Sequence, residues 1–297
     1  MTPLSLAAPA KLNLSLQVVG RRGDGYHLLE SELVLLELAD RLLLLPGAPG
    51  LRVEARPDES GRPGGEIPVD RRNLAWRGLL AGLGREPELV CLALEKRIPA
   101  ASGLGGGSSD AAAGWRLGRR AAGRAEDASA ADLASLATIG ADVPFFAARC
   151  AAAAVGGIGE LVTPIAPPER LRYVVLVHPG FRLSTAEVFA ELRPADLGDP
   201  RPEPGRNDLL APALRLRPEL GDVLRRVVRA GGEPRLTGSG STIFAIGDDP
   251  ERIAGIAARL RRDGLRATET RLRSQPALVE ELPPSPDEGG APPSSMG

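Results

Sequence analysis

The sequence predicts an α+β protein built from two domains. The chain has 297 residues, which is more than one ordinary domain needs. Stretches that alternate in hydrophobicity, as strands do, are interspersed with stretches of helical period. A proline-rich segment around 164–168 separates the two halves. We therefore expect domains at 1–164 and 165–274, followed by a disordered tail at 275–297.

The first half is expected to begin with strands. A long bent strand or strand pair, a turn, a second long strand, a helix and a buried strand are predicted at 4–19, 20–25, 26–45, 73–83 and 89–94. The stretch 57–68 is rich in glycine, proline and charge and predicts an exposed hairpin or a disordered loop. Helices and short strands complete this half at 111–122, 128–139 (with Ser129 as N-cap), 151–155 and 161–164.

The second half opens with a strong strand at 173–177. The segment 236–246 is typical of a glycine turn that enters a strand. Helices are expected at 185–192, 208–214, 220–230 and 250–263, and a last strand at 267–272.

Composition excludes several classes of protein. The formal net charge is −1, with 43% hydrophobic and 25% charged residues, so neither nucleic acid nor a membrane is expected as a partner. The longest apolar run, 33–45, is interrupted by charged residues and predicts no transmembrane helix. Cys91 and Cys150 lie among apolar neighbours and are expected to be reduced, as in the cytoplasm. His27 and His178 lack the spacing of a zinc site.

The segment 99–113, P-A-A-S-G-L-G-G-G-S-S-D-A-A-A, carries the strongest functional signal. Its glycines leave the backbone open to a polyanion and permit positive φ angles. Serines, an aspartate and an alanine-rich helix follow, and a helix N-terminus attracts phosphate. The chain has no Gly-Lys dipeptide and no G-x-G-x-x-G register, which excludes the P-loop and the dinucleotide fingerprint. We therefore expect a third type of phosphate loop, with a flexible linker as the alternative.

Two charged residues in apolar surroundings are candidates for catalysis. All but two of the 37 lysine and arginine residues are arginine, and one of the two lysines, Lys11, lies beside a proline in an apolar strand. Asp142 lies in the apolar segment G-A-D-V-P-F-F, where an unpaired charge would be costly. A Lys–Asp couple beside a phosphate loop would form a phosphoryl-transfer centre. The alternative for Asp142 is to cap a turn before Pro144.

Three further polar or aromatic residues are candidates for contact with a substrate. Asn13 lies two residues after Lys11, on the same face of a regular strand, where it could hold a substrate hydroxyl or orient the carboxylate. Tyr26 and His27 follow a turn with two glycines and offer a stacking ring and a hydrogen-bonding ring. The alternative is that these are ordinary strand residues.

Several motifs together resemble the GHMP small-molecule kinases. They are A-P-A-K-L-N-L at 8–14, R-x-D-G-Y-H at 22–27, the phosphate loop, G-A-D-V-P-F-F at 140–146 and L-T-G-S-G-S at 236–241, and they span roughly residues 3–273. The resemblance implies a two-domain GHMP kinase fold with a ribosomal-protein-S5-like N-terminal domain, a C-terminal α+β sandwich and an active site in the cleft between them. It also implies ATP and Mg²⁺ as cofactors. The acceptor would be the 2-hydroxyl of a cytidine diphosphate derivative of methylerythritol.

The resemblance also implies roles for particular residues. Asp142 would take the proton of the acceptor hydroxyl, and Lys11 would keep that carboxylate ionised and offset developing charge. The residues implied around ATP are Asn73, Lys96, Pro99, Ala100, Ala101, Ser102, Gly103, Leu104, Gly105, Gly106, Gly107, Ser108 and Ser109. Those implied around the acceptor are Asn13, Tyr26, His27, Thr185, Phe189, Gly238, Ser239 and Gly240, with the rings of Tyr26 and Phe189 stacking. The magnesium ligands are unknown, and Ser109 is the nearest candidate.

Some features depart from the family pattern or leave alternatives open. Ala100, Ala101 and Ser102 replace residues that are often glycine or methionine in this loop. Another GHMP kinase, acting on mevalonate, homoserine or a sugar, is the first alternative, although an aliphatic acceptor gives aromatic rings little to contact. An RNA-binding protein with an S5-like domain is the second, and the near-neutral charge argues against it. An inactive homologue is disfavoured because Lys11 and Asp142 are both present. The chain is expected to be a monomer or a homodimer.

Overall fold

The computed structural model describes residues 1–55, 67–170, 172–197 and 205–283. The elements follow in the order β1 (Leu4–Arg21), β2 (His27–Pro46), β3 (Gly50–Ala55), α1 (Leu74–Leu83), β4 (Val90–Lys96), α2 (Gly106–Ala121), α3 (Ala130–Ala137), α4 (Val143–Ala147), β5 (Ala152–Gly157), β6 (Leu161–Pro164), β7 (Tyr173–His178), α5 (Thr185–Ala190), a 3-10 turn (Pro194–Asp196), α6 (Leu210–Leu216), α7 (Leu220–Arg229), β8 (Arg235–Leu236), β9 (Ile243–Gly247), α8 (Pro250–Arg262), β10 (Arg266–Arg271) and β11 (Glu280–Glu281). The loop expected at 57–68 lies, except for its last two residues, outside the described residues.

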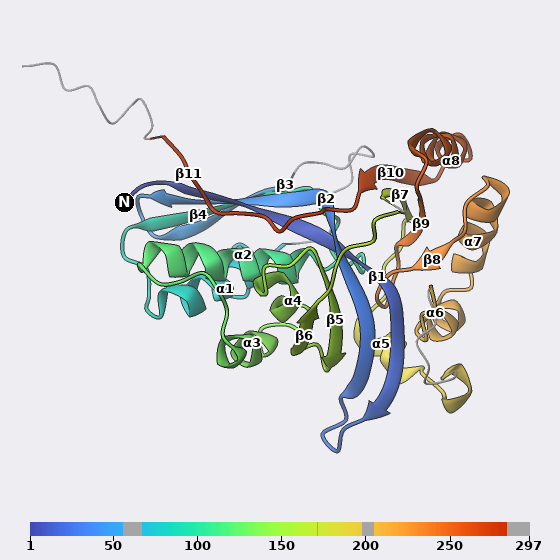
Figure 1. The fold of residues 1–297 in the computed structure, drawn as a ribbon, viewed down its shortest axis with the longest axis horizontal. Coiled ribbons are helices and arrows are strands. Elements are labelled where there is room, and N and C mark those ends of the chain that lie inside the picture. Colours follow the sequence, from blue (N-terminus) through green and yellow to red (C-terminus); the bar gives the residue numbers. More distant parts are fainter. Residues whose placement is uncertain (56–66, 171, 198–204, 284–297) are drawn as a thin grey trace, which may run out of the picture.

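The first half is built around a mixed sheet of seven described strands in the order β11-β1-β2-β4-β3, with β5 and β6 attached beside β2. β1 and β2 form a long antiparallel hairpin, as their alternating apolar residues predict (Figure 1). The last residues of β2 pair with β4 and its first residues pair with β5. Strand β3, parallel to β4, is missing from the sequence-based expectations. The alternation of Leu51 and Val53 with Arg52 and Glu54 is the signal that could have found it.

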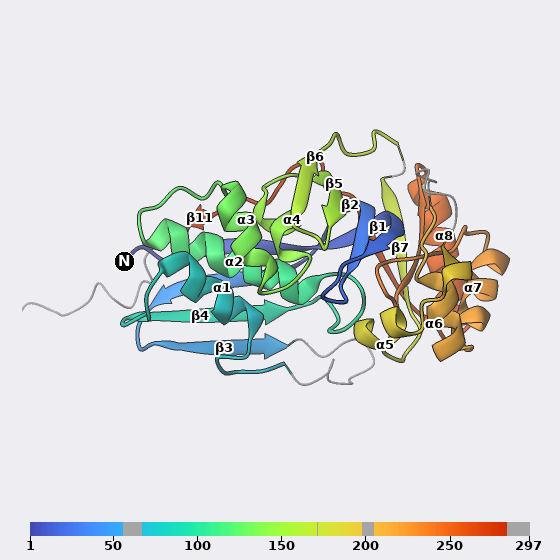
Figure 2. The same cartoon turned by 90° about the horizontal axis from the view of Figure 1, so that it is seen from below.

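Helices α1 and α2 lie together on one face of this sheet (Figure 2). Their contact is unusually close because glycines lie at it. A Cβ on Gly78 would fall 1.9 Å from the carbonyl oxygen of Ala111, and a Cβ on Gly114 would fall 2.2 Å from that of Ala75. The backbones touch at both points. The position of α2, and with it the loop at its N-terminus, is therefore set by helix–helix contact.

The start of α2 differs from the expectation. The sequence predicts a helix from Ala111, but the helix begins at Gly106, with Gly105 as the N-cap residue. Glycine has a low helix propensity, so local preference places the boundary too late. Tertiary packing against α1 overrides that preference. As a result, Gly106, Gly107 and Ser108 lie in the first turn of the helix, where backbone N–H groups have no intrahelical partner.

The second half contains a four-stranded antiparallel sheet, in the order β10-β7-β9-β8, covered by α7 and α8. Leu16 and Val18 of β1 belong to the hydrophobic core of this half, so the long hairpin ties the two halves together. The expected boundary at 164/165 falls between β6 and β7. Of the described helices, none combines the length and the apolarity that crossing a membrane would take.

The end of the described chain differs from the expected disordered tail. After β10 the chain runs back along the first half, and β11 pairs with β1 near the N-terminus (Figure 1). Ala277 is 6% exposed and packs into the core under α1 and α2. The segment has little periodic apolar sequence, and it is held through backbone hydrogen bonds and through Ala277 and the partly buried Val279. Only residues 284–297 of the expected tail lie outside the described residues.

Candidate active site

A cleft of about 610 Å³ lies between the two halves and gathers most of the residues that the sequence singled out. From the set expected at ATP, it is lined by Asn73, Lys96, Pro99, Ala100, Ala101, Ser102, Gly103, Gly105, Gly106, Gly107 and Ser108. From the remaining set, it is lined by Lys11, Asn13, Asp142, Thr185, Phe189, Gly238 and Ser239. Segments separated by more than 200 residues in the chain therefore meet at one site.

The glycine loop has the conformation that a phosphate-binding loop needs. Gly103 and Gly105 have φ angles of 80° and 71°, in the left-handed region that favours glycine. Ala101 also has a positive φ, 53°, which costs about 1 kcal/mol for a residue with a Cβ. The loop then enters α2, whose first N–H groups and positive dipole end favour an anion. The loop and the helix start thus form a backbone cradle for phosphate.

Lys11 and Asp142 come together at this cradle. The Nζ of Lys11 lies 3.4 Å from the Oδ2 of Asp142 and donates a 2.6 Å hydrogen bond to the Oδ1 of Asn13. The lysine side chain is 3% exposed, whereas that of Asp142 is 34% exposed. Asp142 is at the N-cap position of α4, but its carboxylate makes no capping hydrogen bond with a described residue. The capping alternative is therefore wrong, and the carboxylate is accessible from the cleft.

Asn13 lines the cleft and also holds the lysine. Its Nδ2 donates to the Oγ of Ser31 at 2.8 Å, and its Oδ1 accepts from Lys11 and from the Oγ1 of Thr237 at 3.3 Å. The side chain is 6% exposed. Lys11 itself donates its backbone N–H to the carbonyl oxygen of Leu104 at 3.0 Å. The strand, the glycine loop and the second half are thus joined around the lysine.

A second glycine turn, 237–241, packs directly on the first loop. A Cβ on Gly103 would fall 2.5 Å from the carbonyl oxygen of Thr237, and the N–H of Thr242 donates to the carbonyl oxygen of Ser102 at 3.2 Å. A Cβ on Gly238 would lie 3.3 Å from the Nζ of Lys11. Gly238 and Ser239 therefore face the lysine and the cleft.

Lys96 lies on the other side of the loop and has two carboxylate partners. Its Nζ contacts the Oδ2 of Asp40 and donates a 2.7 Å hydrogen bond to the Oδ2 of Asp110. Burial would lower the pKa of Lys96, but the two carboxylates outweigh it and raise that pKa. Burial raises the pKa of Asp110 to about 8, against the attraction of Lys96 and with the repulsion of Asp40. The three side chains form a buried group beneath the first turn of α2, and two of them, Lys96 and Asp110, also border the cleft.

Asn73 also has a structural role at the cleft. It is the N-cap of α1, where its Oδ1 accepts from the N–H of Ala75 at 2.9 Å. Its Nδ2 donates to the carbonyl oxygen of Pro68 at 2.7 Å. The side chain thus fixes the segment that borders the cleft, because both ends of its amide are engaged.

The residues expected at the acceptor are only partly brought together. The Oγ1 of Thr185 and the Oγ of Ser239 lie 2.8 Å apart. The ring of Phe189 lines the cleft and stacks on His27 at a centroid distance of 5.1 Å and an interplanar angle of 21°. Burial, with a smaller effect from Arg21, lowers the pKa of His27. Tyr26 is 63% exposed at the tip of the β1–β2 hairpin and does not line the cleft.

His27 and three further residues expected at the site do not line the cleft either. Leu104 is fully buried and contributes its carbonyl oxygen to Lys11. Gly240 packs toward Leu236. Ser109 is 1% exposed and points to the opposite side of α2. The reason is the helical period, because α2 already begins at Gly106, which turns adjacent serines to different faces.

Because Ser109 does not line the cleft, its neighbour Ser108 becomes the nearest candidate metal ligand. Ser108, not Ser109, lines the cleft, along with Asp142. Within the ranges that the structure describes, no group of three or more His, Cys, Asp and Glu side chains is arranged to hold a metal ion. A Mg²⁺ ion held by one carboxylate, substrate phosphates and water would fit this sparse donor set.

Sequence reasoning missed Asp40 as a site residue and read Asp110 only as a cap. Asp40 is 1% exposed and accepts hydrogen bonds from the backbone N–H groups of Arg97 and Ile98 as well as from Lys96. The signal was an acid inside the apolar run 33–45, where a buried charge needs a partner. No local pattern shows which cation that partner would be.

Comparison with known proteins matches this architecture to one class of enzyme. The family model described as the GHMP kinases N terminal domain matches residues 73–158, and the model described as GHMP kinases C terminal matches residues 186–265. A crystal structure of homoserine kinase from Cytophaga hutchinsonii has a TM-score of 0.61 at 17% identity and covers 94% of this chain and 98% of its own. That likeness extends the shared fold to distant kinases.

More similar proteins define the family within that class. A 4-diphosphocytidyl-2-C-methyl-D-erythritol kinase of Dinoroseobacter shibae is 39% identical over 87% of this chain and 90% of its own length. One of Thermus thermophilus is 39% identical over 86% and 92%. A crystal structure of 4-(cytidine 5'-diphospho)-2C-methyl-D-erythritol kinase has a TM-score of 0.73 at 36% identity and covers 90% of this chain and 98% of its own. The chain therefore belongs to the GHMP kinases and, within them, to the family of 4-diphosphocytidyl-2-C-methyl-D-erythritol kinases.

Proposed function

We propose that this protein transfers the γ-phosphate of ATP to the 2-hydroxyl of 4-diphosphocytidyl-2-C-methyl-D-erythritol, a step of the non-mevalonate route to isoprenoid precursors. The observation that carries the proposal is the pairing of Lys11 with a partly exposed Asp142, 3.4 Å apart, beside a glycine loop at a helix N-terminus. The names of the relatives supply the acceptor.

In the proposed reaction the backbone cradle 103–108 holds the triphosphate of ATP. Asp142 accepts the proton of the acceptor hydroxyl as its oxygen attacks the γ-phosphorus, and ADP leaves. Lys11 keeps the Asp142 carboxylate ionised and balances the charge that develops on the transferred phosphoryl group. Asn13 and the second glycine turn keep the lysine in place.

Mg²⁺ is part of this proposal through the chemistry of the donors. When bound, the ion would neutralise phosphate charge, held by substrate phosphates, water, and Ser108 and Asp142 from the chain. Asn73 and Lys96 border the part of the cleft proposed for the adenosine. Cys91 and Cys150 are both free thiols, which supports the proposal of a reducing, cytoplasmic setting.

The acceptor's cytosine ring is proposed to bind at Phe189. Phe189 is partly buried, lines the cleft and already carries one stacked ring, that of His27. Phe189→Leu is expected to raise KM for the cytidine substrate roughly tenfold, because a stacking ring is lost, without changing KM for ATP. Phe181→Leu is the matched control, since Phe181 lies outside the cleft lining, beneath Arg217. Equal changes in both variants would argue against a ring contact at Phe189.

The activity is tested with purified protein, ATP and three acceptors: 4-diphosphocytidyl-2-C-methyl-D-erythritol, mevalonate and homoserine. ADP release is measured for each, and phosphorus NMR locates the new phosphoester. The proposal expects turnover on the cytidine substrate and phosphate on its 2-hydroxyl. Turnover on mevalonate or homoserine alone would overturn the acceptor, and no ADP release with any acceptor would overturn the kinase.

A further inference from the structure

The described chain ends in a segment that neither family model covers. We call residues 272–283 the C-terminal strap. It leaves the second half after β10, and the N–H of Arg273 donates to the carbonyl oxygen of Leu35 in β2 at 2.8 Å. At its far end β11 pairs with β1, and the N–H of Leu282 donates to the carbonyl oxygen of Pro3 at 2.9 Å. The strap therefore spans the first half from β2 to the N-terminus (Figure 1).

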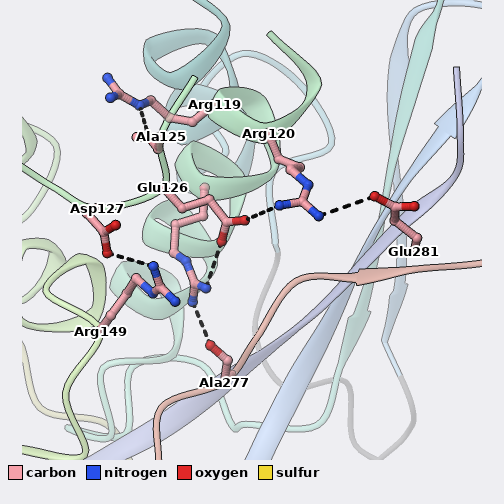
Figure 3. Close-up of polar contacts among 9 residues, drawn as sticks. Arg119, Arg120, Ala125, Glu126, Asp127, Arg149, Ala277 and Glu281 are labelled. Atoms are coloured by element: carbon pink, nitrogen blue, oxygen red, sulfur yellow. Dashed lines mark hydrogen bonds and ion pairs between the residues drawn. The ribbon is translucent and has the colours of Figure 1, made fainter. Parts of the chain in front are cut away.

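The strap is fastened to α2, the helix that begins at the phosphate cradle. Arg116, on the buried side of α2, donates from Nη1 to the carbonyl oxygen of Ala277 at 2.9 Å. The Nη2 of Arg116 donates to the Oε2 of Glu126 at 3.0 Å, and Glu126 also pairs with Arg120, which reaches Glu281 at 3.2 Å (Figure 3). Arg116 thus joins the helix, the loop after it and the strap.

One nitrogen of the Arg116 side chain, Nε, takes no part in these contacts. The guanidinium is 4% exposed, and its Nε has no hydrogen-bond partner in the part of the chain that the structure describes. The Oγ of Ser109 is likewise buried and lacks a partner among residues 1–55, 67–170, 172–197 and 205–283. A buried donor or acceptor without a partner costs about 1–3 kcal/mol, so both atoms call for an explanation.

Both residues line the same small cavity. It has a volume of about 20 Å³ and is bordered by Ser109, Arg116, Phe146, Cys150, Pro276 and Ala277. The last two belong to the strap, so the strap forms one wall. A space of this size exceeds the minimum of roughly 10–15 Å³ for one water molecule.

We propose that this cavity binds one water molecule, which accepts a hydrogen bond from the Nε of Arg116 and exchanges one with the Oγ of Ser109. The strap closes the site, and Arg116 is the residue that carries the connection. Ser109 belongs to the first turn of α2, next to Ser108 and Gly107 of the phosphate cradle. Arg116 is thus a positioning residue for the cradle, a role that rests on the proposed binding of ATP there.

The water itself is tested without any assay of activity. A high-resolution crystal structure of the full chain should show one ordered water within hydrogen-bond distance of Ser109 Oγ and Arg116 Nε. In Ser109→Ala the water should lose one partner, which shows as weaker density. An empty cavity, or a Ser109 hydroxyl bonded to another protein group, would overturn the site whether or not the protein is a kinase.

The role of the strap is tested with two truncations. A chain ending at Ser274 lacks most of the strap, and a chain ending at Pro283 keeps it and serves as the control. The shorter chain is expected to raise KM for ATP about threefold to tenfold with a smaller change in kcat, because the cradle is displaced rather than the catalytic pair. The same KM for ATP in both chains would overturn the positioning role.

If the shorter chain does not fold, a substitution of Arg116 tests the same positioning role. Arg116→Lys keeps the charge but cannot serve the strap, Glu126 and the water at once, because an ammonium lacks the planar fork. It should raise KM for ATP by a few-fold and leave KM for the acceptor unchanged. The matched control is Arg119→Lys, an arginine of the same helix that bonds Ala125 outside the cavity (Figure 3). Calorimetry with an ATP analogue separates the positioning role of Arg116 from the proposed kinase function. If the wild-type protein binds no nucleotide, the kinase proposal is refuted and the water site is not.

Discussion

Lys11 and Lys96, the chain's only lysines, flank adjacent glycines of the phosphate cradle, and their carboxylate partners differ in one respect. A Cβ on Gly105 would lie 3.0 Å from the Cγ of Lys11, and one on Gly106 would lie 3.4 Å from the Nζ of Lys96. The partner of Lys11, Asp142, is 34% exposed. The partners of Lys96, Asp40 and Asp110, are 0% and 5% exposed.

This difference in exposure distinguishes a carboxylate that a substrate can reach from carboxylates that hold parts of the fold together. A carboxylate that acts on a substrate must be reachable from the cleft, and Asp142 meets that condition. The hydrogen bonds of the group formed by Lys96, Asp40 and Asp110 are made to other parts of the protein. They join α2, β2 and the backbone after β4. A buried lysine beside a phosphate loop is therefore not enough to mark a catalytic centre, and the accessibility of its carboxylate partner decides.

The largest expected effect follows from a change in the pair of Lys11 and Asp142. Asp142→Asn should lower kcat by about 10²- to 10⁴-fold, because the amide cannot accept the hydroxyl proton, while an ATP analogue still binds. Steady-state kinetics and calorimetry measure the two properties. Asp127→Asn, at a carboxylate that is 81% exposed and pairs with Arg149, is the control. A near-normal kcat in Asp142→Asn would remove Asp142 as the base.

A change in the group of Lys96, Asp40 and Asp110 should instead lower the free energy of unfolding. Asp40→Asn places an amide N–H₂ against the ammonium of Lys96 or loses the bonds to the backbone, so the free energy of unfolding should fall by about 3–5 kcal/mol. The kcat of the folded fraction should change far less than in Asp142→Asn. Urea unfolding followed by circular dichroism measures this change. Glu37→Gln, on the same strand with a side chain 47% exposed, should change it by less than about 1 kcal/mol. A loss of kcat as large as that of Asp142→Asn would erase the distinction between the two groups.

A conservative change at Lys11 sharpens the comparison further. Lys11→Arg should lower kcat by about 10²-fold, since a planar guanidinium does not fit where an ammonium lies 2.6 Å from Asn13 and the backbone of Gly238 is close. The unfolding free energy should change less than in Asp40→Asn. Retention of more than half of the wild-type kcat would show that any cation suffices at this position.

A pH dependence of stability is expected from the buried group of Lys96, Asp40 and Asp110. The pKa of Asp110 is raised from 3.8 to about 8 in the folded state, so the folded protein holds a proton that the unfolded chain releases. Stability from this group is complete below about pH 4 and is lost as the pH rises toward 8. Asp110→Asn, which resembles the protonated acid, should flatten the decline between pH 5 and pH 8 in urea unfolding. An unchanged slope would mean that Asp110 stays ionised beside Lys96.

The sequence alone predicted a glycine loop that leads into a helix, the pairing of Lys11 with Asp142, and most of the strands and helices. These features are local, because glycine spacing, apolar period and a charge in an apolar run are visible in a short window. The resemblance to GHMP kinases rested on the same local motifs and is confirmed by the comparisons.

Only the tertiary structure decided which residues share a site. Whether a buried acid meets Lys11 or Lys96 depends on contacts between segments such as β2, β4 and α2, which no local pattern contains. The same holds for Ser108 and Ser109, which the early start of α2 turns to opposite faces, and for the strap, which is held by backbone bonds rather than by apolar period. Sequence therefore supplied the chemistry of both lysines, and three-dimensional packing gave Lys11 an accessible carboxylate partner and Lys96 two buried ones.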